Sequence, residues 1–234
     1  TKVQKQYLEI DGKPVLYYSL NVFEQSAVID EVVLVVGENQ VEYCYSEIVL
    51  KYGFDKVKTI VEGGAERYHS VWNGLQKINE DGYVFIHDGA RPFINEEILN
   101  RAYEDVQKCK SCVVGMPVKD TIKLADSEGF VNNTPERSLV WMIQTPQVFE
   151  SGLVKKAYAL LCANFFDNPS KKMKMIGITG TNGKTTSTYL IKNILEQQGK
   201  KVGLIGTIQN MIDQQDIPAK YTTPQAYELN VLLS

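Results

Sequence analysis

Short apolar runs alternate along the first two thirds of the chain with segments whose apolar residues recur at helical spacing. Residues 31–36 form a β-branched run closed by Gly37, which is typical of a strand buried on both faces. Further runs predict strands over residues 58–61, 83–86 and 111–118. Helices are predicted over 14–23, 40–51, from Glu66 onward, and from Asn95, which can cap its helix. This alternation predicts an α/β sandwich around a mostly parallel sheet.

Residues 119–133 interrupt the alternation. They contain polar and β-forming positions with a turn at 126–129, a pattern that predicts a two-stranded β-arm.

Composition narrows the function classes. The chain has 234 residues, of which 44% are hydrophobic and 23% charged, so one large or two small soluble domains are expected. Its net charge of −3 offers no basic footprint, so no nucleic-acid partner is expected. Apolar runs are strand-sized and the opening residues are polar, which predicts no membrane span, no signal peptide and a cytoplasmic location.

The four cysteines are interpreted as free thiols. Cys109 and Cys112 have metal-ligand or redox spacing, but there is no second such pair, and only His69 and His87 could complete a zinc site.

A charged turn follows the apolar run 83–86. Gly89 and Pro92 end the strand, and Asp88 and Arg91 stand at its carboxyl end, where open α/β sheets form their ligand crevice. A carboxylate and a guanidinium there could face a ligand together. The alternative interpretation is a surface ion pair in a tight turn.

A glycine pair, Gly63-Gly64, precedes the helix that starts near Glu66. Such a turn can expose backbone N–H groups to an anion. By itself the pattern is weak, because most glycine pairs are simple turns.

Five blocks in order give the first part of the chain a family resemblance. The blocks are Lys5-Gln6-Tyr7-Leu8 with Gly12-Lys13-Pro14-Val15, Gly63-Gly64-Ala65-Glu66-Arg67 with Ser70-Val71, His87-Asp88-Gly89-Ala90-Arg91-Pro92-Phe93, Pro117-Val118-Lys119-Asp120-Thr121-Ile122-Lys123 and Gln144-Thr145-Pro146-Gln147. With these blocks in this order, the sequence from residue 1 to about 161 resembles the 2-C-methyl-D-erythritol 4-phosphate cytidylyltransferase family.

The resemblance implies a Rossmann-like nucleotidyltransferase sandwich that transfers CMP from CTP to 2-C-methyl-D-erythritol 4-phosphate and releases pyrophosphate, with Mg²⁺ on the nucleotide phosphates. Ribitol 5-phosphate is the alternative acceptor. The catalytic residues it implies are Lys5, Asp88 and Arg137. The substrate-binding residues it implies are Gly64, Arg67, Ser70, Ala90, Arg91, Thr121, Lys123 and Thr145.

Two of these roles depend on the resemblance alone. Lys5 would stabilise charge on the α-phosphate, although a lysine near a terminus is ordinarily a solubility residue. Arg137 would bind the sugar phosphate of a neighbouring subunit, because the arm of the family reaches across a homodimer; the alternative is a solvated loop cation. The arm and Arg137 together span residues 119–137.

Two family features have no counterpart within residues 1–161. One is the amino-terminal Gly-rich loop with its catalytic arginine, and the other is a carboxyl-terminal Asn-x-Lys segment. Both contact phosphates in the family, so their loss is expected to lower turnover.

The remainder, from about 164 to 234, has a different pattern. An apolar run at 175–179 predicts a strand, a glycine-rich loop follows, a helix runs to Gln198 before Gly199, and 202–205 predicts another strand. This is the context of a phosphate-binding P-loop in a partial β-α-β unit. The strict spacing would place glycine at position 178, where Ile178 stands, and a chance match is the alternative.

The loop resembles the ATP loop of Mur ligases, and most closely that of UDP-N-acetylmuramoyl-tripeptide synthetase. By that resemblance Thr222 and Thr223 would approach a UDP-sugar, and Thr185 would hold Mg²⁺ with ATP. The ATP-binding residues it implies are Gly180, Thr181, Asn182, Gly183, Lys184, Thr185 and Thr186.

About 70 residues give a small core, so this segment is expected to be loosely ordered or packed against the first domain. Two alternatives to the cytidylyltransferase therefore stay open. One is an ATP-binding module, and the other is a non-catalytic fusion of two gene fragments.

Overall fold

The computed structural model describes residues 4–78, 81–206, 208–213, 215–217, 224 and 226–234. The chain divides into two compact units, Thr1–Lys155 and Lys156–Ser234. Helix α5, Ser151–Phe165, spans the boundary between them.

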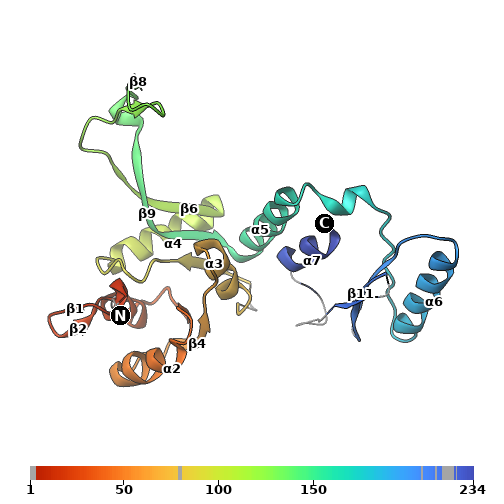
Figure 1. The fold of residues 1–234 in the computed structure, drawn as a ribbon. Helices are drawn as coiled ribbons and strands as arrows, with labels where there is room; N and C mark the ends of the chain where they lie inside the picture. The colour runs from red at the N-terminus through yellow and green to blue at the C-terminus, as the bar shows by residue number, and fades with distance from the viewer. Residues whose placement is uncertain (1–3, 79–80, 207, 214, 218–223, 225) are drawn as a thin grey trace. The chain divides into compact units, whose positions relative to one another are not determined.

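The first unit alternates helices and strands in the order that the sequence predicts (Figure 1). Its helices and helical turns are η1 Lys5–Tyr7, α1 Val15–Gln25, α2 Val41–Cys44 with the π-helix η2 Tyr45–Leu50, α3 Arg67–Leu75, α4 Glu96–Cys109 and η3 Arg137–Leu139. Its strands are β1 Glu9–Ile10, β2 Lys13–Pro14, β3 Val32–Val36, β4 Val57–Glu62, β5 Tyr83–Ile86, β6 Ser111–Pro117, β7 Leu124–Ala125, β8 Val131–Asn133 and β9 Trp141–Glu150.

The expectation of a mostly parallel sheet is wrong for the described residues. Strands β3 and β4 pair in parallel, whereas β5, β9 and β6 form a separate antiparallel sheet in that order. The reason is the path of β9, which returns from the arm and runs against both neighbours, with Val84 opposite Phe149 and Cys112 opposite Val148. The result is a mixed α/β architecture.

Local signals placed the helices well. Pro14 directly precedes α1, and the fixed φ of proline suits the start of a helix. Helix α1 buries Leu16 and Leu20. At α4 the Asn95 side chain accepts a hydrogen bond from the Ile98 N–H at 2.9 Å, which confirms the predicted cap.

Two apolar clusters hold the first unit together. The larger joins α1 to β3, α2 and α4, and its most buried members include Leu20, Ile48 and Leu99. The smaller packs Val106 of α4 against Val148 of β9. Burial of such side chains stabilises the fold by roughly 1.5–3 kcal/mol each.

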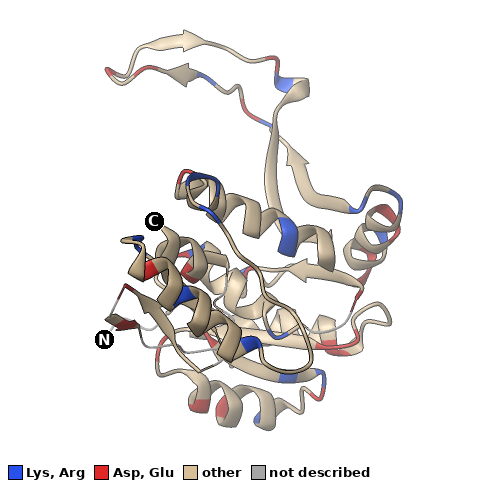
Figure 2. Cartoon of the chain, turned by 90° about the vertical axis from the view of Figure 1, so that its right-hand side faces the viewer, with Lys and Arg blue, Asp and Glu red and all other residues tan. Residues whose placement is uncertain are grey.

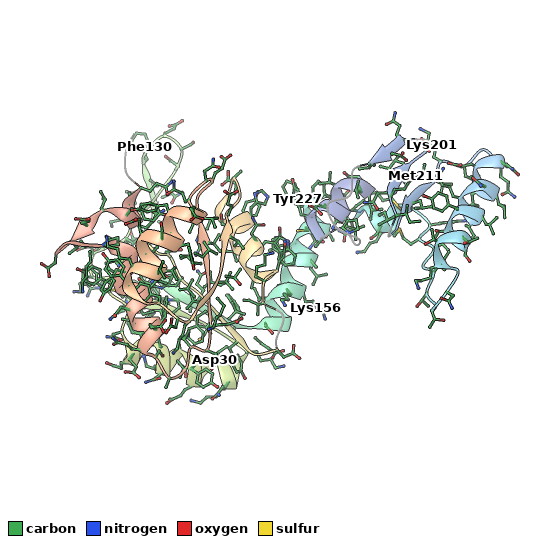
Figure 3. The ribbon with its side chains drawn as sticks, turned by 90° about the horizontal axis from the view of Figure 1, so that it is seen from below. Asp30, Phe130, Lys156, Lys201, Met211 and Tyr227 are labelled. Atoms are coloured by element: carbon green, nitrogen blue, oxygen red, sulfur yellow. The ribbon has the colours of Figure 1, made fainter. Side chains whose placement is uncertain are left out.

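The predicted β-arm is confirmed. Strands β7 and β8 pair antiparallel, with Leu124 opposite Asn133, and Figure 1 shows β8 at the tip of a long projection from the body. Phe130, labelled in Figure 3, is 68% exposed near the arm's turn.

The second unit contains η4 Pro169–Lys172, α6 Lys184–Gln197, β10 Gly203–Ile205, β11 Asn210–Ile212, β12 Gln215–Ile217 and α7 Ala226–Leu233. The helix and the strand predicted near 184–198 and 202–205 are confirmed.

The strand predicted over 175–179 is wrong, because those residues form no strand and Met175 and Ile176 are exposed. Strand β10 instead pairs antiparallel with β11, and β11 with β12. A strand needs a neighbour for its hydrogen bonds, and here β10 takes another partner. The P-loop β-α-β unit is therefore not formed in the described residues.

Among the residues described, no helix combines the length and the apolar character needed to cross a membrane.

Candidate functional site

A cleft of about 1020 Å³ opens in the first unit. Its walls come from β3, β5, α1 and α3, and its rim includes the Gly63-Gly64 turn and the Asp88 loop. Both turns follow the carboxyl ends of strands, β4 and β5, which is where the sequence predicts a ligand crevice.

Asp88 is held between two arginines at this rim. Arg67 of α3 donates to Asp88 Oδ1 from Nη2 at 2.9 Å and from Nε at 3.2 Å, and Arg91 donates from Nε to Asp88 Oδ2 at 3.0 Å. The Arg91 side chain also contacts Gln144 Oε1. Two guanidinium groups on one carboxylate leave a net positive charge, which suits an anionic ligand.

The pKa of Asp88 lies below its usual range. Burial would by itself raise the pKa, but the hydrogen bonds and charges of Arg67 and Arg91 outweigh it. Asp88 is therefore an anion that positions cations, and it is not set up as a proton donor.

A partly buried hydrogen-bond network holds this loop in place. The Arg91 carbonyl accepts from His87 Nε2 and from Ser19 Oγ, each at 3.0 Å. Thr145 Oγ1 accepts from the Asp88 N–H at 3.3 Å and lies 3.1 Å from His87 Nδ1. With Nε2 donating to the carbonyl, Nδ1 accepts from Thr145. Burial lowers the pKa of His87, so the neutral ring holds the loop.

The glycine pair forms a tight turn that needs its glycines. A side chain at Gly63 would meet Ser70 Oγ at 2.6 Å, and one at Gly64 would meet His69 Cβ at 2.4 Å. Ser70 Oγ accepts from the Gly64 N–H at 3.1 Å and donates to the Glu66 carbonyl at 3.3 Å. The turn is thus pinned to the first turn of α3.

The structure brings most of the rim residues predicted from sequence together. Arg67, Asp88 and Arg91 are in direct contact, Thr145 joins them through Asp88, and Ala90 lines the cleft beside them.

Lys5 does not line the cleft, although the residues on either side of it do. It is exposed in η1 between Gln4 and Gln6, both of which line the cleft.

The candidate residues on the arm make their contacts within the arm and not with the Asp88 group. Arg137 donates from Nη1 to the Lys119 carbonyl at 3.3 Å, and Lys123 donates to Thr134 Oγ1 at 2.9 Å. Thr121 is exposed on the same projection. Their contacts stay within the arm, so a single copy does not join them to Asp88.

The glycine-rich loop of the second unit is open. Gly183, at φ 75°, precedes α6, and Lys184 Nζ turns back to the Gly180 carbonyl and lies 3.5 Å from the Thr181 carbonyl. The Thr185 carbonyl accepts a hydrogen bond from Thr188 Oγ1 at 2.7 Å. Asn182 and Thr186 are exposed beside it. The predicted UDP-sugar residues, Thr222 and Thr223, lie outside the described residues.

The described residues contain no cluster of three histidine, cysteine or acidic side chains able to hold a metal ion. The four cysteines are unpaired; Cys44 and Cys162 are buried, and Cys109 is exposed. Figure 2 shows that basic and acidic residues are both spread over the helices and turns.

Sequence reasoning missed Ser19, His87 and Gln144, which support the loop. Ser19 is 1% exposed on the face of α1 that carries Leu16 and Leu20. A polar residue within an apolar stripe was the signal that could have identified it. Gln144 and His87 adjoin predicted site residues, but only the fold brings position 144 to position 91.

Two family models match successive parts of the chain. The model of the 2-C-methyl-D-erythritol 4-phosphate cytidylyltransferase family matches residues 1–178, and that of the Mur ligase middle domain matches residues 178–234. The cytidylyltransferase of Lachnospira eligens is 50% identical over 168 residues, covering 71% of this chain and 74% of that protein. That of Caldanaerobacter subterraneus subsp. tengcongensis is 38% identical over 225 residues, covering 95% and 87%.

Solved structures agree with the relatives. The 4-diphosphocytidyl-2C-methyl-D-erythritol synthase of Anaerococcus prevotii superposes with a TM-score of 0.63 at 28% identity, covering 80% of this chain and 76% of that one. The Francisella tularensis 2-C-methyl-D-erythritol 4-phosphate cytidylyltransferase gives 0.58 at 26% identity, covering 74% and 76%.

Proposed function

This chain belongs to the 2-C-methyl-D-erythritol 4-phosphate cytidylyltransferase family of nucleotidyltransferases, and we propose that it transfers CMP from CTP to 2-C-methyl-D-erythritol 4-phosphate with release of pyrophosphate. The observation that carries the proposal is the Arg67–Asp88–Arg91 arrangement at the rim of the cleft, beside the glycine turn. It presents positive charge where two anionic substrates must meet.

In the proposed reaction, an oxygen of the acceptor phosphate forms a bond to the α-phosphorus of CTP. The bond from that phosphorus to the bridging oxygen breaks, and its electron pair leaves with pyrophosphate. Catalysis of this kind rests on positioning and on charge stabilisation rather than on proton transfer. Lys5 would stabilise the charge that develops on the α-phosphate.

Binding of the nucleotide is assigned to the glycine turn. The bare backbone at Gly64 permits close approach, Ser70 holds the turn in shape, and Arg67 links it to Asp88. Asp88 would orient Arg91 toward the acceptor, Ala90 lines the wall, and Thr145 supports the Asp88 backbone.

Mg²⁺ would arrive with CTP, held by its phosphates. Asp88, whose carboxylate is engaged by Arg67 and Arg91, is a poor direct ligand, and the described residues offer no metal cluster of their own. The ion would neutralise phosphate charge; the protein residues orient the two substrates.

The arm supports a homodimer in which Thr121, Lys123 and Arg137 serve the site of the other copy. Large apolar side chains are exposed along it, including Leu139 at 76% and Trp141 at 56%. Such a stripe favours burial against a second copy. Sedimentation of the full chain, compared with a Trp141→Ser variant, tests this; a monomer at micromolar concentration would contradict it.

The catalytic proposal is tested by pyrophosphate release from CTP, Mg²⁺ and 2-C-methyl-D-erythritol 4-phosphate. We expect Asp88→Ala to lower kcat/KM by at least about a hundredfold, because Arg67 and Arg91 lose the group that positions them. The matched control is Glu97→Ala, which removes an exposed carboxylate paired with Arg101 and should leave turnover unchanged.

Two further comparisons are added to that assay. Ribitol 5-phosphate is offered as the competing acceptor, and preference for it would reassign the substrate. A version with a Gly-rich, arginine-bearing loop placed before Thr1 is run in parallel. Equal turnover of the Asp88→Ala and parent chains in both backgrounds would refute the assignment.

ATP binding by the second unit is the alternative function, favoured by the Mur ligase match over residues 178–234. Equilibrium binding of labelled ATP, lost on Lys184→Ala and kept on Lys192→Ala, would support it. Absence of both pyrophosphate release and ATP binding would favour a non-catalytic fusion.

A further inference from the structure

The turn that carries Asp88 and Arg91 is closed on itself and fixed at both ends. The Arg91 N–H donates to the Asp88 carbonyl at 2.9 Å, which closes the turn. At the entry, the Asp88 N–H donates to Thr145 Oγ1 of β9 at 3.3 Å. At the exit, the Arg91 carbonyl accepts from Ser19 Oγ of α1 at 3.0 Å. Two different elements therefore hold the two ends.

The His87 ring joins these two attachments. Its Nδ1 lies 3.1 Å from Thr145 Oγ1, and its Nε2 lies 3.0 Å from the Arg91 carbonyl. Nε2 also lies 3.4 Å from Ser19 Oγ. One imidazole thus links the entry and the exit of the turn, and both of its nitrogens take part. We call this set of contacts the His87 bridge.

The His87 bridge fits one protonation state of the ring. A carbonyl only accepts, so Nε2 must carry a proton toward Arg91. The Thr145 hydroxyl accepts from the Asp88 N–H and has its own proton to donate, and Nδ1 of the neutral ring accepts it. A second ring proton on Nδ1 converts that nitrogen into a donor. The Thr145 proton then loses this acceptor, and the bridge is weakened at the entry of the turn.

The ring has uncharged neighbours on α1 and β9. Phe23 of α1 lies edge-on to it, with ring centroids 5.4 Å apart, and Ser19 belongs to the same helix. Thr145 is its neighbour on β9. None of these three side chains carries a charge that would offset a positive charge on the ring, so they favour its neutral form.

The charges that act on the ring, in the part of the chain that the structure describes, are those of Asp88 and Arg91 in its own loop. Burial is the largest influence and lowers the pKa of His87. The hydrogen bond with the Arg91 carbonyl and the negative charge of Asp88 act against burial, and the positive charge of Arg91 acts with it. The net result is a pKa below the usual value, which agrees with a neutral bridge.

The bridge also governs where the Arg91 guanidinium stands. Its Nε donates to Asp88 Oδ2 at 3.0 Å, and its Nη1 contacts Gln144 Oε1. Both partners are sequence neighbours of residues in the bridge. A turn released at its entry would therefore move Arg91 relative to both partners. Misplacement of a positioning group by about 1 Å can lower a rate about a hundredfold.

We propose that neutral His87 is a positioning residue that locks this turn and sets Arg91 for the phosphate of the acceptor, and that protonation of its ring releases the turn and lowers turnover in acid. This inference rests on the proposed function, in which Arg91 faces the acceptor. His87 itself makes no bond to a substrate. Its effect therefore falls on binding of the acceptor and not on binding of CTP.

The kinetic test measures pyrophosphate release by the full chain and by its His87→Gln and His87→Phe variants. Glutamine can donate to the Arg91 carbonyl and does not titrate, whereas phenylalanine keeps the packing against Phe23 and loses both hydrogen bonds. At about pH 8 we expect His87→Phe to raise KM for the acceptor at least about tenfold and KM for CTP less than about twofold. His87→Gln should recover most of that loss.

The pH profile separates this role from a structural one. The acceptor phosphate itself titrates near about pH 6, and it does so equally with every variant. The ratio of kcat/KM between the parent and His87→Gln therefore isolates the ring, and we expect it to fall at least about threefold from about pH 7.5 to about pH 5. A constant ratio would overturn the assignment of the acid loss to His87.

A measurement on the unaltered chain needs neither turnover nor a stable variant. The chain has two histidines, and the spectrum of His69→Gln assigns their ¹⁵N ring signals. We expect the His87 ring to carry its proton on Nε2 near neutral pH and to titrate below the usual value of about 6.5. The Asp88 amide should shift along the same curve, because its N–H is bonded to Thr145.

The outcomes separate failure of this inference from failure of the proposed function. A ring protonated on Nδ1 at neutral pH, or a ring whose titration leaves the Asp88 amide unchanged, would overturn the bridge whether or not the chain turns over. Equal rises of both KM values in His87→Phe would indicate general damage and overturn the positioning role. No pyrophosphate release by the parent at any pH would refute nucleotidyl transfer and the role in acceptor binding with it, while the ring spectra still decide the bridge.

Discussion

The chain contains two glycine-rich turns that each lead into a helix, and their packing differs. Gly63-Gly64 follows the paired strand β4 and is pinned by Ser70 at the start of α3. The loop from Gly180 to Gly183 precedes α6, but no strand stands before it.

Space around the glycines shows the same contrast. Side chains at Gly63 and Gly64 would lie within 3.0 Å of neighbouring atoms, whereas one at Gly183 would meet nothing within 4 Å. Lys184 turns back to the carbonyls of Gly180 and Thr181 in its own loop, while Arg67 reaches Asp88 in the loop after β5. A glycine-rich turn is thus held in one shape where it follows a paired strand, and keeps only local contacts where no strand precedes it.

The largest expected difference lies in the cores. Leu99 in α4 is fully buried, so Leu99→Ala should lower the free energy of unfolding by about 2–5 kcal/mol. Leu190 in α6 is 58% exposed, so Leu190→Ala should change it by less than about 0.5 kcal/mol. Urea denaturation followed by tryptophan fluorescence and circular dichroism measures both. Equal losses would remove the distinction between the units.

Proteolysis probes the same contrast at the backbone. Lys171, Lys172 and Lys174 precede the exposed Met175 and Ile176. Lys56, by contrast, donates to the Ser26 carbonyl at 2.7 Å beside β4. Native-state trypsin should cut at 171–174 more than tenfold faster than at Lys56. Residues 164–234 as resistant as the rest would contradict the expected loose order of the second unit.

Helix caps give a smaller effect. The Asn95 side chain caps α4, whereas α6 begins after Gly183 without a side-chain cap. Asn95→Ala should cost about 1 kcal/mol of unfolding free energy, and Asn95→Ser should retain most of it. Thermal unfolding of the parent and the two variants measures this. An Asn95→Ala variant as stable as the parent would show that the cap does not stabilise the fold.

The smallest expected effect is a pH dependence. Because the folded pKa of Asp88 lies below its unfolded value of about 3.9, its stabilisation is present above that value and lost as pH falls through the folded pKa. The stability advantage of the parent over Asp88→Asn should therefore shrink below about pH 4.

Asp167 provides the comparison in the second unit. Its hydrogen bond with Lys172 also lowers its pKa, but the pair is exposed, so Asp167→Asn should show a weaker trend. Denaturation at pH 3 and pH 6 measures both variants. A stronger trend at Asp167 than at Asp88 would reverse the ranking.

The site was predicted in its parts and assembled by the fold. Asp88 and Arg91 are three residues apart, so a turn brings them together and the sequence could indicate their pairing. Arg67, Thr145 and Ser19 come from distant segments, and no local pattern states that they converge on the same loop. The family resemblance, rather than spacing, named Arg67 and Thr145 as candidates, and it did not name Ser19.

The sequence by itself determined the helices and the turns, because their hydrogen bonds close within a few residues. The start of α1 after Pro14 and the Asn95 cap are of this kind. Tertiary structure decided the strands, because each strand takes its hydrogen bonds from another segment. Residues 32–36 pair with β4 and form a strand, whereas residues 175–179, for which the sequence also predicts a strand, form none.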